Sequence, residues 1–391
     1  MKLLHINVTC ASGSTGGIIQ DINKCLRNED PSCEAYVAYS VGENRKGCFK
    51  YITSLEFFMI RAFRKLFGKT LLGTGIPTRR LIRYIKKIKP DIIHMHTIHH
   101  QALHYKKLFR FLATYKGQVV YTLHDCWPFT GGCYHYSEVG CDPNSCLHKA
   151  CVQGSAELDC RKKAKNKSYE AKRELLNAIP NLTFTAVSNW LAGEAKDSYL
   201  REKPVVTVHN GIDVHTFKPM TVEKNQRFTV ISVASHWTPR KHLDILLEMA
   251  DMLPEMDFVV VGSVKRTVEP RDNVHFVGST ASRQQLSELY NKAHVFANFS
   301  TEETFGLVTA EAMACGLPVV AFNKTACAEI VEQGCGFAAA DQNAFKEALC
   351  TLKNSDLNVF SAKCRSVVEE KYSKENMAQK YYELYCGLLK Q

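Results

Sequence analysis

The amino-acid sequence predicts an α/β protein with two doubly wound domains, each built on a mostly parallel sheet. Short apolar runs alternate with amphipathic stretches, and this alternation occurs twice along the chain. The length of 391 residues also exceeds what one hydrophobic core usually serves. Short continuous apolar runs are typical of parallel strands buried on both faces, with helices completing the βαβ units.

The first series of strands is expected before residue 190. Its apolar runs are residues 3–8, 91–96, 118–124 and 182–188. The second series comprises residues 227–235, 257–262, 274–278, 293–300 and 317–322, with helices expected over 242–253 and 282–293. From Gly336 to the end we expect only helical and polar sequence, because residues 374–389 carry apolar side chains at helical spacing.

A domain boundary is expected between the two series. Asn210 and Gly211 indicate a turn, and Pro219 interrupts regular structure. We therefore place the hinge near residue 217. This gives an N-terminal domain over 1–216, a C-terminal domain over 217–370 and a last helix within 371–391 that packs back on the first domain.

Composition favours a globular protein of the cytosol. Apolar residues make up 45% and charged residues 23% of the chain, which is far from the composition of disordered proteins. The first residues enter strand-like sequence directly, and no run of about 18 apolar residues suggests a membrane span. The sixteen cysteines are expected to be mostly reduced, because a disulfide scaffold requires a short secreted chain.

Residues 300–320 carry the most informative pattern. The helix that begins near Gly306 would offer unpaired amides and the positive end of its dipole to a phosphate. Glu303 precedes this helix and Glu311 lies within it, so both carboxylates are candidates to accept hydrogen bonds from sugar or ribose hydroxyls. The alternative is that both are solvated surface residues.

The pattern from Glu303 to Val320 resembles the donor-binding signature of the retaining family 4 glycosyltransferases of GT-B fold. Its elements are Glu-x7-Glu, with Phe-Gly-Leu after the first Glu and Ala-Met-Ala-Cys-Gly-x-Pro-Val-Val after the second. The resemblance implies two Rossmann-like domains that face each other across a cleft. It also implies that Glu311 binds the nucleotide ribose, and that Glu303 with the amides of Phe305, Gly306 and Leu307 holds the donor sugar and diphosphate.

Cations near the start of the second domain extend the resemblance. The family carries an Arg and, five residues later, a Lys-Gly pair that neutralise the departing diphosphate. Here Lys241 matches the Lys, His236 stands in place of the Arg, His242 replaces the Gly, and Arg240 is an adjacent candidate for the missing charge. Such cations stabilise negative charge in the transition state. Without the Glu pair, Arg240 and Lys241 would be ordinary solvated residues.

The first domain contributes two further candidates. Gly16 and Gly17 lie in a Gly-rich turn expected between the first strand and its helix, and by resemblance they match the family's glycine pair near the donor phosphate and acceptor. His124 ends the strand 118–124 and resembles the family's active-site His near the sugar hydroxyls. The neighbouring His94, His96, His99 and His100 are interpreted as lining the same edge.

The resemblance also implies a reaction. A hexosyl group passes from a UDP- or GDP-linked sugar to an acceptor hydroxyl with retention, by a front-face route in which the β-phosphate accepts the proton. Neither a protein nucleophile nor any cofactor is required, because Lys241 and the helix N-terminus compensate the charge that a metal would otherwise meet.

The Cys-rich segment points to a subgroup. Trp127 to Gly131 with the continuation that follows resembles bacterial enzymes that build capsule, exopolysaccharide or O-antigen, so we expect a lipid-linked oligosaccharide as acceptor. In the loop 133–151, a structural zinc held by Cys133, Cys141, Cys146 and Cys151 is one interpretation. Reduced or partly disulfide-linked cysteines are the alternative, since these spacings are not standard zinc knuckles.

The formal net charge of +11 is concentrated in the first half of the chain. Residues 61–89 carry ten Lys or Arg residues and no acidic residue, mixed with Phe and Leu. This combination fits peripheral contact with the anionic inner face of a membrane, whereas a solvated helix face is the plainer interpretation.

Two other function classes stay open. A nucleic-acid-binding protein would account for the charge but leave the Glu pair unexplained, and we do not expect nucleic acid as a partner. A GT-B protein that binds nucleotide sugars as a catalytically silent subunit would account for the departures at His236 and His242.

Overall fold

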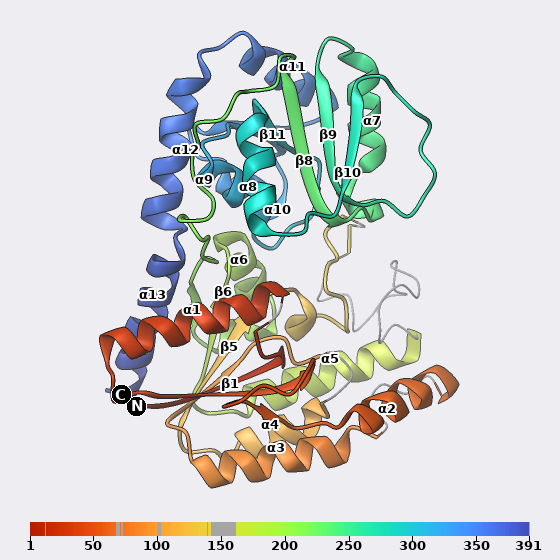
Figure 1. Cartoon of the computed structure of the whole chain (residues 1–391). Coiled ribbons are helices and arrows are strands. Elements are labelled where there is room, and N and C mark those ends of the chain that lie inside the picture. The colour runs from red at the N-terminus through yellow and green to blue at the C-terminus, as the bar shows by residue number, and fades with distance from the viewer. Residues whose placement is uncertain are drawn as a thin grey trace. The chain divides into compact units, whose positions relative to one another are not determined.

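The computed structural model describes residues 1–11, 13–67, 71, 73–99, 103–138, 140–141 and 162–390. The chain divides into two compact units, Met1–Val208 with Ala378–Gln391, and His209–Met377 (Figure 1). The linker expected near residue 217 falls inside the second of these units. The last helix expected from sequence is α13, Lys374–Leu389, and most of it belongs to the first unit.

A seven-stranded sheet in the order β3-β2-β1-β4-β5-β6-β7 forms the centre of the first unit. All its neighbouring strands are parallel. The strands are β1 (Lys2–Thr9), β2 (Glu34–Val41), β3 (Phe49–Lys50), β4 (Ile92–Met95), β5 (Gln118–Leu123), β6 (Leu182–Ala186) and β7 (Val205–Thr207). The strand order reverses between β1 and β4, which is the position where doubly wound sheets bind ligands.

Helices connect these strands in the first unit. They are α1 (Gly13–Glu29), α2 (Ser54–Phe67), α3 (Gly75–Ile88), α4 (Tyr105–Leu112), α5 (Lys162–Asn177) and α6 (Asn189–Asp197), with short 3-10 turns η1 (Trp127–Phe129) and η3 (Tyr199–Glu202). The end of α13 completes the core, because Tyr381 and Tyr385 are fully buried and bond to polar side chains of the sheet.

The second unit has a six-stranded parallel sheet in the order β10-β9-β8-β11-β12-β13. Its strands are β8 (Thr229–His236), β9 (Asp257–Ser263), β10 (Val274–Gly278), β11 (Val295–Asn298), β12 (Val319–Phe322) and β13 (Gly336–Ala339). The accompanying helices are η4 (Pro239–Lys241), α7 (Leu243–Met252), α8 (Arg283–Lys292), α9 (Leu307–Ala314), α10 (Thr325–Ile330), α11 (Gln342–Lys353) and α12 (Leu357–Lys371). Here the order reverses between β8 and β11.

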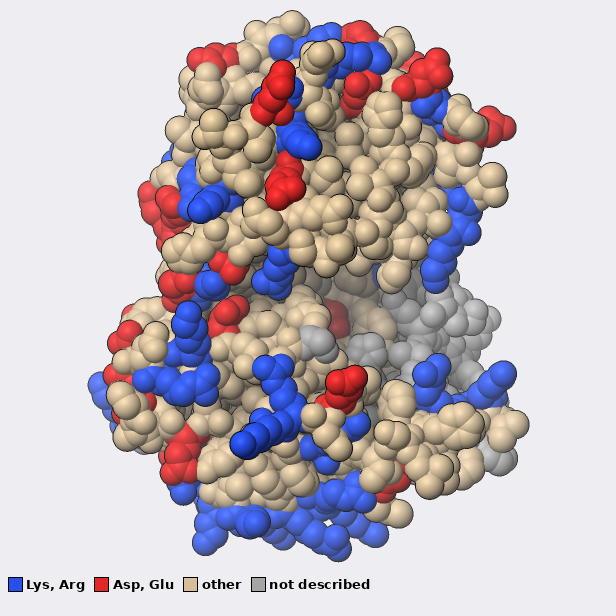
Figure 2. All heavy atoms as spheres, in the orientation of Figure 1, with Lys and Arg blue, Asp and Glu red and all other residues tan. Residues whose placement is uncertain are grey.

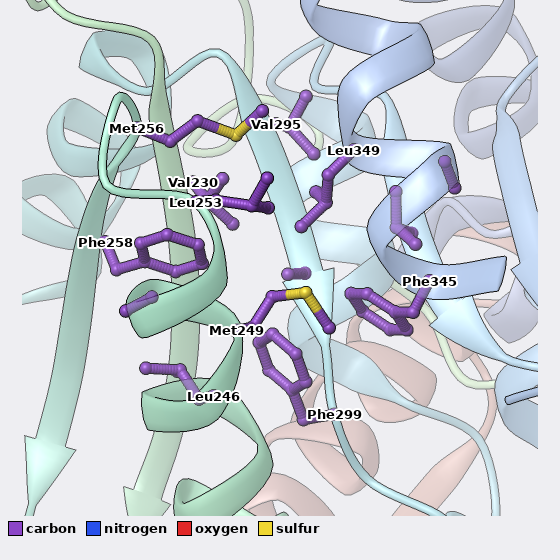
Figure 3. Close-up of a cluster of buried hydrophobic side chains, with 14 of the residues drawn as sticks. Val230, Leu246, Met249, Leu253, Met256, Phe258, Val295, Phe299, Phe345 and Leu349 are labelled. Atoms are coloured by element: carbon purple, nitrogen blue, oxygen red, sulfur yellow. The ribbon is translucent and has the colours of Figure 1, made fainter. Parts of the chain in front are cut away.

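The core of the second unit lies between this sheet and the helices α7 and α11. Met249 of α7 points toward Phe299 and Phe345, whose rings stack with centroids 4.6 Å apart (Figure 3). Apolar residues of β8, β9 and β11 close the cluster from the sheet side. Burial of this side-chain area, at about 25 cal/mol per Å², is the main force that holds helices and sheet together.

The two doubly wound sheets predicted from the sequence are confirmed. The expectation that only helices follow Gly336 was wrong, because β13 begins there and pairs with β12 at the edge of the sheet. The edge strands β3 and β7, and β2 with its interspersed Tyr and Ser, were also missed. No helix among the described residues is long and apolar enough to cross a membrane.

Candidate functional site

Lys241 and Glu303 meet at the point where the strand order of the second unit reverses. Lys241 follows β8 and Glu303 follows β11, and these neighbouring parallel strands end at the same edge of the sheet. The Lys241 ammonium forms an ion pair with Oε1 of Glu303. A second link joins the same two loops, because Nε2 of His242 lies 2.9 Å from Oγ1 of Thr301. Two segments that are 62 residues apart therefore present a cation and a carboxylate together.

His242 stands where the family pattern has Gly. The backbone conformation at this position shows why the family pattern has a Gly there. Its φ of 48° and ψ of 53° place it in the left-handed region between η4 and α7. A non-glycine residue pays a steric cost of about 1–2 kcal/mol there. The chain thus keeps the backbone geometry of a Lys-Gly turn with a larger residue in it.

The loop after Glu303 leads into α9 through Gly306. Gly306 caps α9 with a φ of 93°, and the neighbouring Phe305 is buried. The first amides of a helix have no acceptor within the helix, and the helix dipole adds positive potential at this end. The amides of Gly306 and Leu307 are therefore placed to bind an anionic group.

Glu311 lies in the second turn of α9. Burial raises the pKa of its carboxyl to about 7, and the nearby Arg283 opposes this only in part. A carboxyl group with this pKa changes its protonation state near neutral pH. It can accept hydrogen bonds from hydroxyls fully only in the ionised state.

A cavity of about 460 Å³ opens at the carboxyl ends of β9 and β10. Its lining includes backbone and side chains of Gly262, Ser263, Val264, Arg266, Val268, Phe276, Gly278 and Ser279. Ser263 pairs with His236, the exposed last residue of β8, so the cavity is adjacent to the loop that carries Arg240 and Lys241. Its lining combines the aromatic Phe276 with small residues, a composition that suits a flat heterocycle.

Gly16 and Gly17 lie inside α1, which begins at Gly13. The Gly-rich turn expected before the helix is therefore the start of the helix itself, which begins five residues earlier than the sequence indicated. A Cβ on Gly16 would lie 2.7 Å from the carbonyl carbon of Ala11, so no larger side chain fits without moving backbone. Gly17 is only partly exposed.

His124 directly follows β5 at the edge of the first sheet. Its Nε2 lies 3.1 Å from Nδ1 of the buried His96, and burial lowers the pKa of His124 to about 4. The next residue, Asp125, pairs with Nε2 of His99 at 3.2 Å. His96 and His99 were interpreted from the sequence only as edge residues, and the structure joins them to His124 and Asp125.

Lys172 of α5 is a residue that sequence reasoning missed. It is fully buried, its ammonium donates to the carbonyl oxygen of Trp127, and it lies 3.9 Å from the centroid of the Trp127 ring. These contacts hold η1 immediately after His124 and Asp125. A lysine on a charged helix gives no local signal of burial, so only the tertiary structure identifies it.

The Cys-rich loop is only partly described. Cys133 is buried and Cys141 is partly exposed. Cys146 and Cys151 lie outside the described residues. The zinc site therefore stays a prediction.

Sequence profiles of two families match the chain in turn. The profile described as Glycosyltransferase Family 4 matches residues 55–216, and that described as Glycosyl transferases group 1 matches residues 227–355. The chain belongs to the family 4 glycosyltransferases. The resemblance noted in residues 300–320 is thus confirmed at the level of the family. The roles of individual residues stay predictions.

A relative from Escherichia coli extends the match over the full length of this glycosyltransferase. It is 22% identical to the putative colanic acid biosynthesis glycosyl transferase WcaC of Escherichia coli, over 99% of this chain and 100% of that protein. It is 32% identical to a D-inositol 3-phosphate glycosyltransferase of Mycolicibacterium gilvum, over 29% of this chain and 30% of that protein.

Solved structures confirm the GT-B fold of the glycosyltransferase. The sucrose-phosphate synthase of Thermosynechococcus elongatus has a TM-score of 0.71 at 16% identity, with 99% of each chain covered. Anabaena HepE, solved in complex with UDP-glucose, has a TM-score of 0.65 at 16% identity, covering 99% of this chain and 100% of that chain.

Proposed function

We propose that this glycosyltransferase moves a hexosyl group, with retention of configuration, from a UDP- or GDP-linked sugar to a hydroxyl of a growing lipid-linked oligosaccharide in cell-surface polysaccharide synthesis. WcaC, which is similar to this chain over its full length, is named for colanic acid biosynthesis, which supports a role of this kind. HepE was solved with UDP-glucose, which supports a nucleotide-sugar donor.

The observation that carries the proposal is the Lys241–Glu303 pair beside the N-terminus of α9. Cleavage of a sugar–phosphate bond develops negative charge on the departing diphosphate. A fixed ammonium and helix amides stabilise that charge in the transition state. Glu303 would then hold Lys241 in place before the donor arrives and accept hydrogen bonds from sugar hydroxyls afterward, while Arg240 adds positive charge at the same loop.

The resemblance to the family supplies the other proposed donor contacts. The cavity beyond β9 and β10 would take the base, because Phe276, Gly278 and Ser279 line it. Glu311 would bind the ribose hydroxyls. Gly16, Gly17 and His124 of the first unit would serve the donor phosphate, the sugar hydroxyls and the acceptor.

Peripheral contact with an anionic membrane on the cytoplasmic side is part of the proposal. On α2 and at the start of α3 the large apolar side chains Leu55, Phe58, Leu66 and Ile76 are 62–74% exposed. Figure 2 shows Lys and Arg gathered along the border of the first unit where Figure 1 draws α3. Within the basic run 61–89, the charge of Arg80 is compensated by an acidic residue of α2, because Arg80 forms an ion pair with Glu56 at 3.0 Å. Cations beside exposed apolar residues suit a surface that rests on anionic lipid.

We propose that catalysis needs no cofactor, since Lys241 and the start of α9 supply the positive charge. Turnover that is unchanged in excess EDTA would support this. Turnover that EDTA abolishes and Mg²⁺ or Mn²⁺ restores would contradict it.

The test of the function is a donor screen followed by product analysis. UDP-, GDP- and ADP-sugars are compared as stabilisers in thermal unfolding, since a ligand at 100 times its Kd stabilises a fold by about 2.7 kcal/mol. We expect one nucleotide to stabilise the wild type and not Glu311→Ala. The anomeric proton coupling of the product then reports retention or inversion. A donor that binds without turnover on any acceptor would instead favour the catalytically silent alternative.

A further inference from the structure

A cavity of about 570 Å³ lies in the first unit where β4 and β5 begin. The ends of α3 and α13 contribute to its lining, and we call it the α3–α13 cavity. Gln118 of this lining is the first residue of β5, whereas His124 follows the last one. The six residues of β5, at about 3.3 Å each, separate the two places by roughly 20 Å. The cavity therefore lies at the opposite edge of the sheet from the candidate site residue His124.

Part of the lining of the α3–α13 cavity is apolar. Ile85 of α3 and Leu388 of α13 are buried, and Phe111 of α4 is partly exposed. Leu389, at the end of α13, keeps 44% of its surface exposed beside them. An apolar group in the cavity would remove the exposed parts of Phe111 and Leu389 from water, which is favourable. The volume is also within the range of about 300–1,000 Å³ that is usual for small-molecule sites.

Three cations line the same cavity. They are the exposed residues Lys86, Lys89 and Lys116, which we call the cavity lysines. The ammonium of Lys86 lies 5.8 Å from the centroid of the Phe111 ring, and this contact favours a position of the charge at the border of the apolar lining. A ligand that carries a negative charge next to an apolar chain would contact both parts of the lining.

The other polar groups of the cavity do little to oppose an anion. Asp91 is the one carboxylate among its lining residues, and Oδ2 of Asp91 accepts a hydrogen bond from the backbone amide of Lys2 at 2.6 Å. The hydroxyl of Tyr115 donates to the carbonyl oxygen of Pro90. Burial, and then Asp91, raise the pKa of Tyr115 to about 12, so this hydroxyl carries no charge at pH 7. Three ammonium groups and one carboxylate give the lining a formal charge of +2.

We propose that the α3–α13 cavity binds one anionic phospholipid. The phosphate lies among the cavity lysines, and the start of an acyl chain lies against Phe111 and Leu389. The affinity for an anionic amphiphile rests on the cavity alone. The choice of a membrane lipid as its source rests on the membrane contact that is part of the proposed function.

The outer face of α3 favours a membrane lipid over a soluble amphiphile. Arg79, Arg83 and Lys87 are exposed on the same helix that supplies Ile85 and Lys86 to the cavity. Figure 2 shows Lys and Arg gathered along the border of the first unit where Figure 1 draws α3. Cations placed in this way attract an anionic bilayer surface, and they would bring its lipids to the opening of the cavity.

The test is isothermal titration of the full chain with dihexanoyl phosphatidylglycerol below its critical micelle concentration, where the lipid forms no surface. We expect saturable binding of one molecule per chain. Dihexanoyl phosphatidylcholine, which has the same chains but no net charge, should bind at least tenfold more weakly, and so should inorganic phosphate, which has no chain. Absence of phosphatidylglycerol binding would overturn the proposal, as would equal affinity for either of the other two ligands.

A triple variant with Gln at the cavity lysines should bind phosphatidylglycerol at least tenfold more weakly than the wild type. The matched control removes the same amount of charge from α3 and leaves the lining of the cavity unchanged; it combines Arg79→Gln, Arg83→Gln and Lys87→Gln. All six substituted residues are exposed, so both variants should fold. Equal losses of affinity in the two variants would indicate attraction to the whole basic face and would overturn the site.

NMR of methyl-labelled leucine locates the ligand. The lipid should shift the signals of Leu388 and Leu389 and leave that of Leu349, in the core of the second unit, unchanged. Shifts that spare Leu388 and Leu389 would overturn the location of the site.

Co-flotation with anionic vesicles separates this site from the proposed function. If the wild type binds the monomeric lipid but does not float with vesicles, the proposed membrane contact fails and the cavity remains a site for an anionic amphiphile. If it floats with vesicles but does not bind the monomeric lipid, the lipid site fails and the membrane contact remains.

Discussion

Lys241 shows how much of the site depends on one contact. Its partner Glu303 is 62 residues away and reaches it only because β8 and β11 are neighbours in the sheet. The side chains are 27% and 16% exposed, so part of their charge remains solvated. The pair therefore matters more for charge placement than for stability.

Lys241→Ala should lower kcat by roughly 100- to 1,000-fold, because one fixed donor to the developing charge is lost. Global stability should change by less than about 1 kcal/mol. The matched control is Lys371→Ala, which breaks the 2.7 Å ion pair with Glu332 elsewhere in the second unit. Steady-state rates and urea unfolding measure both effects, and equal losses of activity in the two variants would refute the assignment.

Glu311 should make nucleotide binding depend on pH. Its pKa of about 7 means that it is increasingly protonated as the pH falls from 8 to 6, and the protonated form accepts ribose hydroxyls poorly. UDP should therefore bind up to about tenfold more tightly at pH 8 than at pH 6.

Isothermal titration with UDP measures this dependence. The terminal phosphate of UDP itself titrates at about pH 6, so the decisive quantity is the difference between wild type and Glu311→Gln. Glu311→Gln should retain only the dependence that comes from the phosphate. Identical profiles for both proteins would show that Glu311 does not titrate at the site.

His242 offers a test of backbone strain. His242→Gly removes the left-handed penalty and also the bond to Thr301, two terms of about 1 kcal/mol that nearly cancel. His242→Val keeps the strain and loses the bond, so it should be about 1 kcal/mol less stable than His242→Gly. Thermal unfolding compares the stabilities of the two variants. Equal melting temperatures would argue against a strained backbone at His242.

At the scale of elements, helix α2 exposes more large apolar side chains than any other helix that the structure describes. Phe58 and Leu66 are 70% and 74% exposed, although residues of their size are usually turned inward. Clustered exposed apolar residues beside cations are the feature by which a peripheral membrane face is recognised.

The triple variant Leu55→Gln, Phe58→Gln and Leu66→Gln should lose most of its binding to vesicles that contain about 30% anionic lipid, because each buried side chain contributes roughly 1.5–3 kcal/mol. Co-flotation with vesicles measures it. Val359→Gln on α12 is the control, since Val359 is 69% exposed but lies in the second unit. Undiminished flotation of the triple variant would exclude this face as the membrane contact.

At the scale of the whole molecule, the C-terminal segment of the chain belongs to the same compact unit as the N-terminal segment. Helix α13 starts in the second unit and ends in the first, where Tyr381 and Tyr385 bond to Thr122 and His94 of the central strands. The C-terminal helix thus completes the core of the N-terminal unit around β4 and β5.

Tyr385→Ala should destabilise the first unit by about 3–5 kcal/mol, because it leaves a cavity in the core. Tyr385→Phe should cost only about 1 kcal/mol, for the hydrogen bond to His94. Urea unfolding followed by circular dichroism compares them. Leu389→Ala at the half-exposed end of the same helix is the control, and a loss as large as that of Tyr385→Ala would indicate general fraying of α13 instead.

The sequence alone determined the two doubly wound sheets and the segment from Glu303 to Val320, because apolar periodicity and the Glu, Gly and Pro spacings are local properties of the chain. The sequence did not determine which loops lie in contact in the folded protein. The Lys241–Glu303 pair depends on strand order, the burial of Lys172 depends on the packing of α5, and the contact of His96 with His124 depends on the pairing of β4 with β5. These contacts join residues far apart in sequence, and the free energy that selects them comes from burial in the folded core, so only the tertiary structure decided them.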